Sequence, residues 1–141
     1  MRIDSEALMK KEQFKFDRDG LLAAVIQDHR NGAVLMVGYM DYEALNRTVE
    51  AKKVCFWSRS RQEYWVKGET SGNVFHLVSI YYDCDADALL VNVLPGGAGK
   101  ACHTGNYSCF YNLLHEEKAN ALTESGCKVK HMHEPETGRE D

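Results

Sequence analysis

Apolar runs separated by turn-forming residues mark most of the strands that this chain is expected to form. Two such runs, LLAAVIQDHR and AVLMVGYM, flank Asn31-Gly32. Asparagine followed by glycine reaches the positive φ angles of a tight turn at little cost, so the pattern predicts a β-hairpin. Three more runs are rich in β-branched and aromatic residues, which suit a pleated surface. They are VCFWS (54–58), NVFHLVSIYYD (73–83) and ALLVNVL (88–94).

One helix is expected between the hairpin and the next strand. Asp41 is a favourable N-cap, Glu43 lies in the first turn, and the helix should end near Ala51, just before two lysines. The glycine-rich segment PGGAGK (95–100) predicts a loop, and SCFYNLL (108–114) is expected to return as a strand. The pattern as a whole predicts an α+β fold, dominated by sheet and with few short helices.

Length and composition favour one soluble domain. The chain has 141 residues, of which 44% are hydrophobic and 27% charged, enough apolar material for a single core. The net charge of −4 leaves no broad basic surface for nucleic acid. Neither a secretory signal nor a membrane-spanning run is evident, so we expect a cytoplasmic protein. The expected organisation is an N-terminal extension (1–20), a domain (21–115) and a polar C-terminal tail (116–141).

The stretch DCDADALL carries the strongest chemical signal. In an extended chain, alternate side chains share a face, so Asp83, Asp85 and Asp87 would lie together with Cys84 opposite. Three adjacent carboxylates repel one another, and a bound hard cation such as magnesium relieves the repulsion. An equally supported interpretation is a polar turn in which the aspartates bond to nearby backbone amides.

Two further cysteines suggest a second metal. Thiolates select zinc over magnesium, and the three ligands Cys84, Cys102 and Cys109 would leave a fourth position for water. Isolated cysteines without a CxxC pair are also common core residues, so the spacing leaves both interpretations open. His103 could replace a cysteine ligand or act as a general acid/base beside the metal, and we favour the second role.

A segment rich in glycine, charge and hydroxyl groups precedes the aspartates. Backbone amides of WVKGETSG (65–72) could approach a phosphate or sugar closely, and two preceding arginines could hold phosphate through paired hydrogen bonds. Each feature alone is also typical of a solvated turn. The candidate substrate-binding residues are Arg59, Arg61, Trp65, Lys67, Glu69 and Ser71.

Three consecutive blocks resemble the phosphoribosyl-AMP cyclohydrolase family: FWSRSR with WVKGETSGNV, then DCDADALL, then ACHTGNYSCFY. The similarity extends from about Leu21 through Tyr111. It implies an intertwined homodimer with one zinc ion per subunit, held by cysteines drawn from both chains, and a magnesium site. The implied zinc ligands are Cys84, Cys102 and Cys109, and the implied magnesium ligands are Asp83, Asp85 and Asp87.

The resemblance also implies a reaction. Members of this family hydrolyse the N1–C6 bond of N1-(5-phosphoribosyl)-AMP with zinc-activated water. The product is phosphoribosyl-formimino-aminoimidazole carboxamide ribotide, and the reaction is the third step of histidine biosynthesis. His103 is the candidate proton carrier. Magnesium and the basic groups Arg59, Arg61 and Lys67 would hold the phosphates. Some relatives carry a second catalytic domain, for which the segment after Tyr111 is too short, so one step is expected.

Other interpretations of the cysteines and histidines are weaker. Zinc nucleobase deaminases attack a related ring carbon, but their paired HxE and PCxxC signature is not present. A non-catalytic dimerisation module, in which thiolates close the zinc completely, is the main alternative. Cys55 and Cys127 match no ligand position, and His131 and His133 are expected to lie in a solvated terminus.

Overall fold

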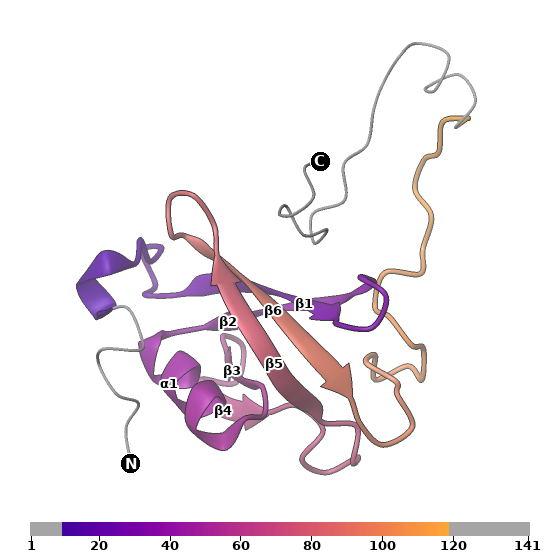
Figure 1. Ribbon diagram of the computed structural model, residues 1–141, viewed down its shortest axis with the longest axis horizontal. Helices are drawn as coiled ribbons and strands as arrows, with labels where there is room; N and C mark the ends of the chain where they lie inside the picture. The colour runs from indigo at the N-terminus through magenta and orange to yellow at the C-terminus, as the bar shows by residue number, and fades with distance from the viewer. Residues whose placement is uncertain (1–9, 119–141) are drawn as a thin grey trace, which may run out of the picture. The chain divides into compact units, whose positions relative to one another are not determined.

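A four-stranded mixed sheet is the centre of the fold (Figure 1). The computed structural model describes residues 10–118. Strands follow the order β2-β1-β6-β5, in which the outer pairs are antiparallel and β1 runs parallel to β6. Two hairpins therefore lie side by side. Their bounds are β1 Leu22–Asp28, β2 Val34–Met40, β5 Phe75–Tyr82 and β6 Ala88–Pro95.

The predicted hairpin around Asn31-Gly32 is confirmed, but its turn is wider than a two-residue turn. Polar side chains explain the extra residues. The Asp28 carboxylate accepts the backbone N–H of Arg30, and the Asn31 side chain accepts that of Ala33, both at 2.9 Å. Gly32 has a φ of 79°, which glycine adopts without strain.

The predicted helix is confirmed, and it begins directly after the predicted N-cap residue Asp41. Helix α1 spans Tyr42–Ala51, and the Asp41 side chain accepts the backbone N–H of Ala44 at 2.8 Å. The helix packs against β3 (Cys55–Ser58), which pairs with β4 (Glu63–Val66) in a separate two-stranded sheet.

Alternate residues of the central strands form one core together with α1 and the first aromatic residues of the described chain. Phe14, which follows the short 3-10 helix η1 (Lys11–Gln13), is buried in this core. Among the largest fully buried side chains are Leu22, Ile26, Leu35, Met40, Leu45, Phe56, Phe75, Val91 and Val93. The sheet-dominated α+β class is thus confirmed.

The predicted strand over SCFYNLL is wrong. In residues 108–118, where the structure describes the chain, no regular secondary structure is present. The first unit of the chain ends at Phe110, while Leu113 and Leu114 in the second unit are exposed and bury no apolar face of the kind that stabilises a strand. Within the described residues, no helix is both long and apolar enough to cross a membrane.

Candidate metal and nucleotide site

The segment from Asp83 to Asp87 is a turn between β5 and β6, so the extended geometry expected from the sequence is wrong. Hydrogen bonds to Asp83 explain the turn. Its carboxylate accepts the backbone N–H groups of Asp87 and Ala88 at 3.0 and 3.2 Å, and its carbonyl accepts that of Ala86. The alternation argument that placed Cys84 opposite the aspartates therefore does not apply, and Cys84 is an exposed residue of the same turn.

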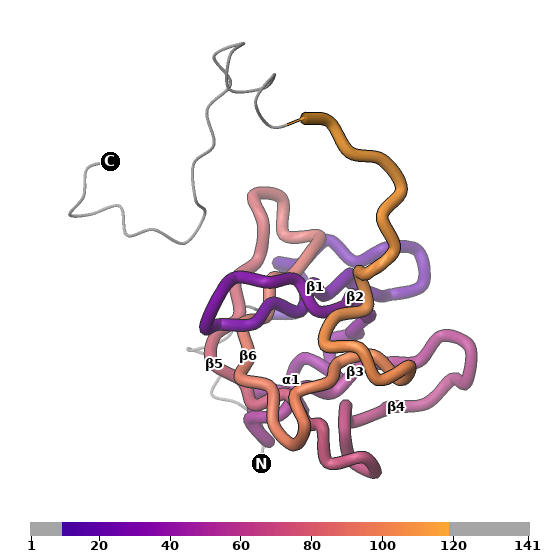
Figure 2. The backbone as a smooth tube through the Cα atoms, turned by 90° about the vertical axis from the view of Figure 1, so that its right-hand side faces the viewer, coloured from indigo at the N-terminus to yellow at the C-terminus, as the bar shows by residue number. Residues whose placement is uncertain are grey.

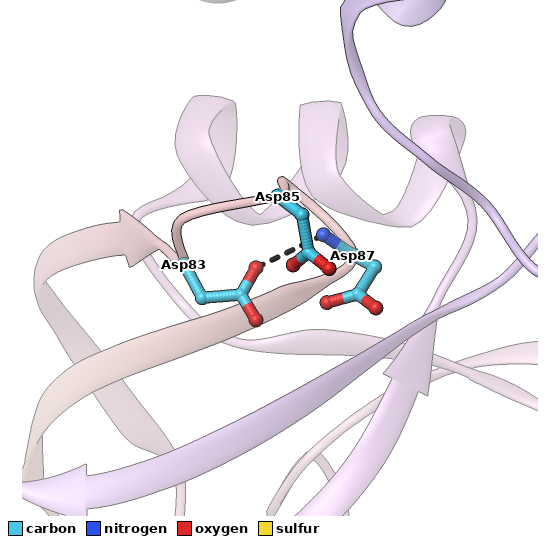
Figure 3. A group of neighbouring side chains, drawn as sticks. All are labelled: Asp83, Asp85 and Asp87. Atoms are coloured by element: carbon cyan, nitrogen blue, oxygen red, sulfur yellow. Dashed lines mark hydrogen bonds between the residues drawn. The ribbon is translucent and has the colours of Figure 1, made fainter.

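The three carboxylates converge nevertheless (Figure 3). Asp83, Asp85 and Asp87 each offer an oxygen within 4.8 Å of the others, and all three side chains are exposed. Hydrogen bonding with Asp85 and then with Asp83 raises the pKa of Asp87 to about 6. Carboxylate oxygens that converge in this way suit a hard cation such as magnesium.

A second group of candidate ligands lies on the loop of residues 101–109. Backbone hydrogen bonds close this loop, from Ala101 to Tyr107 and from Cys102 to Asn106. The Cys102 thiol accepts the Thr104 hydroxyl at 3.0 Å, which lowers the pKa of Cys102. Burial raises the pKa of Cys109, and a hydrogen bond between the two thiols adds to the effect. The cysteine loop therefore holds two sulfur atoms in mutual contact.

The cysteine loop is attached to β2, as the orange segment beside β2 in Figure 2 shows. The Cys109 backbone N–H donates to the carbonyl of Leu35 at 2.7 Å, and the Ser108 hydroxyl donates to that of Val34 at 2.8 Å. These bonds fix Cys109 on the central sheet.

Cys84 does not join this pair. Within residues 10–118, the three aspartates are the only group of three or more potential ligands that meet within 4.8 Å. One chain thus brings together two of the three predicted zinc ligands, Cys102 and Cys109. Paired thiols, one with a lowered pKa, are a donor set that fits zinc, and a third protein ligand for zinc would have to come from outside this pair.

Lys67 lies on the cysteine side of the site. Its side chain is buried, with the ammonium nitrogen 5.5 Å from the centre of the Phe75 ring. Burial lowers the pKa of Lys67, whereas electrostatic attraction to Cys109 and Cys102 opposes that change. The structure therefore separates Lys67 from the other basic candidates, because Arg59 and Arg61 are exposed.

Those two arginines border a groove of about 680 Å³. The Arg59 guanidinium lies 4.0 Å from the centre of the Tyr39 ring, and that of Arg61 lies 5.7 Å from the Trp65 ring. Trp65 lies on β4, whereas Lys67 follows that strand in a turn. The groove walls are Met36 to Tyr39, Phe56 to Arg61, and Trp65.

Sequence patterns missed the β2 wall of the groove. The glycine at position 38, within an otherwise apolar strand, was the one sign in the sequence of a close approach at this wall. A Cβ atom there would lie 2.5 Å from the ring of Phe56. The absent side chain admits Phe56, whose ring packs against Trp65 at 5.1 Å between centres. The groove thus has an aromatic floor and cationic edges, which suits a base and its phosphates.

The other predicted residues do not line the groove. Glu69 and Ser71 are exposed in the turn after β4, where Gly68 has a φ of 82° and leaves no room for a Cβ atom beside Asn73. His103 is exposed on the cysteine loop, directly after Cys102. Its position is compatible with proton transfer near the paired thiols.

Comparisons with known proteins repeatedly find one family. A family model described as phosphoribosyl-AMP cyclohydrolase matches residues 36–111. A phosphoribosyl-AMP cyclohydrolase of Chelativorans sp. (strain BNC1) is 48% identical over 126 residues, covering 87% of this chain and 91% of the relative. That of Cereibacter sphaeroides is 54% identical, with 72% and 83% covered. A histidine biosynthesis bifunctional protein of Photobacterium profundum is 58% identical, covering 67% of this chain and 44% of the relative.

Proposed function

This chain belongs to the phosphoribosyl-AMP cyclohydrolase family, and we propose that it opens the adenine ring of N1-(5-phosphoribosyl)-AMP with water activated by zinc. It is an enzyme of this type, a hydrolase of histidine biosynthesis. The observation that most supports the zinc chemistry is the contact between the thiols of Cys102 and Cys109 on a loop fixed to the central sheet.

We assign the third zinc ligand to Cys84 of the partner subunit in a homodimer. Support comes from the separation of Cys84 from the cysteine pair within one chain, together with its exposure. In a twofold dimer, the exposed thiol of one chain can lie beside the pair of cysteine thiols on the other chain. Each dimer would then contain two equivalent zinc sites.

Zinc, when bound by three protein ligands, supplies an open position and lowers the pKa of water to near 7. The chain's own residues bind and orient the substrate beside it. Water adds to C6, the N1–C6 bond breaks, and N1 receives a proton, leaving a carboxamide on the imidazole. The exposed His103, next to Cys102, is positioned to carry that proton.

The groove beside Trp65 is the proposed binding site for the nucleotide. Its aromatic floor can stack with the purine, and Arg59 and Arg61 can bind a phosphate at its edge. Lys67, which lies near the thiols and does not line the groove, is assigned to the reacting part of the ring. Glu69 and Ser71, which are exposed in the turn after β4, are assigned to a ribose hydroxyl.

Magnesium is assigned to the convergent aspartates Asp83, Asp85 and Asp87, where oxygen ligands within 4.8 Å of one another match its chemistry. It would neutralise substrate phosphate rather than act on the ring. A cytoplasmic location is proposed, in keeping with a small-molecule substrate and reduced cysteines.

The reaction is tested by incubating the purified protein with N1-(5-phosphoribosyl)-AMP and following ring opening by ultraviolet absorbance. The product should gain the mass of one water molecule. Activity should disappear after zinc removal and return with added zinc. Turnover that survives complete zinc removal would refute the proposed chemistry.

A further inference from the structure

We propose that Asp28 is a positioning residue for the metal-binding cysteines and that it acts through Tyr107 of the cysteine loop. Asp28 is the last residue of β1, and it has no part in the chemistry proposed above. The inference rests on the proposed zinc site for its functional meaning, but all the contacts that carry it lie within one chain.

Asp28 is a buried charge whose hydrogen-bonding capacity is filled. Its side chain is 0% exposed. The carboxylate accepts hydrogen bonds from Nε and Nη2 of Arg30, at 3.0 and 2.7 Å, and from the backbone N–H of the same residue at 2.9 Å. A buried carboxylate is costly unless it is paired in this way, so its position is tightly fixed.

The remaining bond of Asp28 reaches the cysteine loop. The Tyr107 hydroxyl donates to Oδ2 of Asp28 at 2.5 Å and accepts a hydrogen bond from the Asn31 side chain at 3.1 Å. The backbone carbonyl of Tyr107 also accepts the N–H of Ala101 at 3.2 Å, which closes the loop. One residue therefore closes the cysteine loop and attaches it to a fixed charge on the hairpin.

The two cysteines depend on this attachment to different degrees. Cys109 has its own hydrogen bond to Leu35 on β2, whereas the backbone N–H of Cys102 bonds only within the loop, to Asn106. The hydrogen bonds that join Cys102 to the hairpin consequently run through Tyr107, whereas the neighbouring Ala101 is held by burial in the core. Loss of the tyrosine hydroxyl should loosen Cys102 more than Cys109, and so degrade the ligand pair.

The Tyr107→Phe variant removes the hydroxyl and keeps the ring. Tyr64→Phe is the matched control, because the Tyr64 hydroxyl donates a similar bond to Asp41 at 2.7 Å, away from the cysteine loop. Two quantities are compared: zinc affinity by chelator competition, and the rate of Cys102 modification in metal-free protein, measured by mass spectrometry. We expect Tyr107→Phe to accelerate Cys102 modification and to weaken zinc binding about tenfold. That loss is at the lower end of the range measured when residues that support metal ligands are replaced. Tyr64→Phe should change neither quantity.

Two further outcomes complete the test. Adding Asp28→Asn to Tyr107→Phe should weaken zinc binding little beyond the single tyrosine variant, because the two residues act through one bond. The inference is overturned if Tyr107→Phe leaves both quantities at wild-type values, or if both tyrosine variants weaken zinc binding equally. If the wild-type protein binds no zinc, the proposed function fails, while the rate of Cys102 modification still decides whether Asp28 and Tyr107 order the loop.

Discussion

The Tyr107 hydroxyl donates a hydrogen bond to the buried carboxylate of Asp28, joining the cysteine loop to the end of β1 across 79 positions of sequence. Hydrogen bonds from Arg30 are the main reason that the pKa of Asp28 is lowered from 3.8 to about 2, and Tyr107 contributes in the same direction against the effect of burial. This contact links the stability of the fold to the geometry of the site.

The lowered pKa of Asp28 predicts that the free energy of unfolding falls in acid. A carboxylate whose pKa is lower in the folded state stabilises the protein above its unfolded pKa, and this contribution is lost as pH falls from about 4 towards 2. The shift corresponds to about 2 kcal/mol. Urea unfolding of metal-free protein should show that Asp28→Asn is less stable at pH 7 and loses less additional stability between pH 4 and 2. An unchanged acid slope in the variant would contradict this assignment.

Replacing Cys84, Cys102 or Cys109 by serine should remove bound zinc and activity together, because a hydroxyl is a poor substitute for a thiolate. The loss of activity should exceed about 100-fold, since substitutions of mere supporting residues already cost 10- to 100-fold in metal affinity. Zinc content by atomic absorption and turnover are measured on the same samples. Cys55→Ser is the control, because Cys55 is buried beside Thr48, apart from the cysteine pair. Full zinc content and turnover in Cys102→Ser would refute the ligand assignment.

The aspartate turn should be separable from the zinc site. Asp85→Asn is expected to raise the magnesium concentration needed for half-maximal activity by about tenfold, because it removes one charged oxygen ligand, while zinc content stays at the wild-type level. The exposed Asp19, changed to asparagine, is the control and should alter neither quantity. Parallel loss of both metals would indicate one merged site.

The groove predicts a difference between two similar arginines. Arg59 and Arg47 each lie 4.0 Å from the centre of a tyrosine ring, but only Arg59 borders the groove. Arg59→Met should raise KM about tenfold through loss of a charged hydrogen bond to phosphate, with kcat less affected. Arg47→Met should leave both constants near wild-type values. Equal effects of the two substitutions would argue against phosphate binding in the groove.

Local patterns were sufficient for the parts of the fold that local chemistry determines. Asp41 marked the start of α1, and Asn31-Gly32 marked the first hairpin. The strand β4 was not predicted, because EYWV alternates weakly and is stabilised by pairing with β3. SCFYNLL was misread because apolar character alone does not supply a partner strand.

The candidate site shows the same division. Residue types identified the aspartates and cysteines, but the extended geometry assumed for Asp83 to Asp87 was wrong, because the Asp83 carboxylate bonds to backbone amides and bends the chain. The burial of Lys67 beside the thiols, and the bond from Tyr107 to Asp28, depend on contacts distant in sequence. No local spacing rule specifies such contacts.

The account as a whole depends on a zinc site completed by two chains. Inactive Cys84→Ser and inactive Cys109→Ser proteins, mixed under conditions that permit subunit exchange, should form heterodimers with one damaged site and one site that retains all three ligands. Random pairing makes about half of the dimers mixed, and each has one intact site of two, so activity should recover to at most about a quarter of the wild-type value. Each protein alone should remain inactive. Heterodimers demonstrated by mass spectrometry that regain no activity would contradict a zinc site shared between subunits.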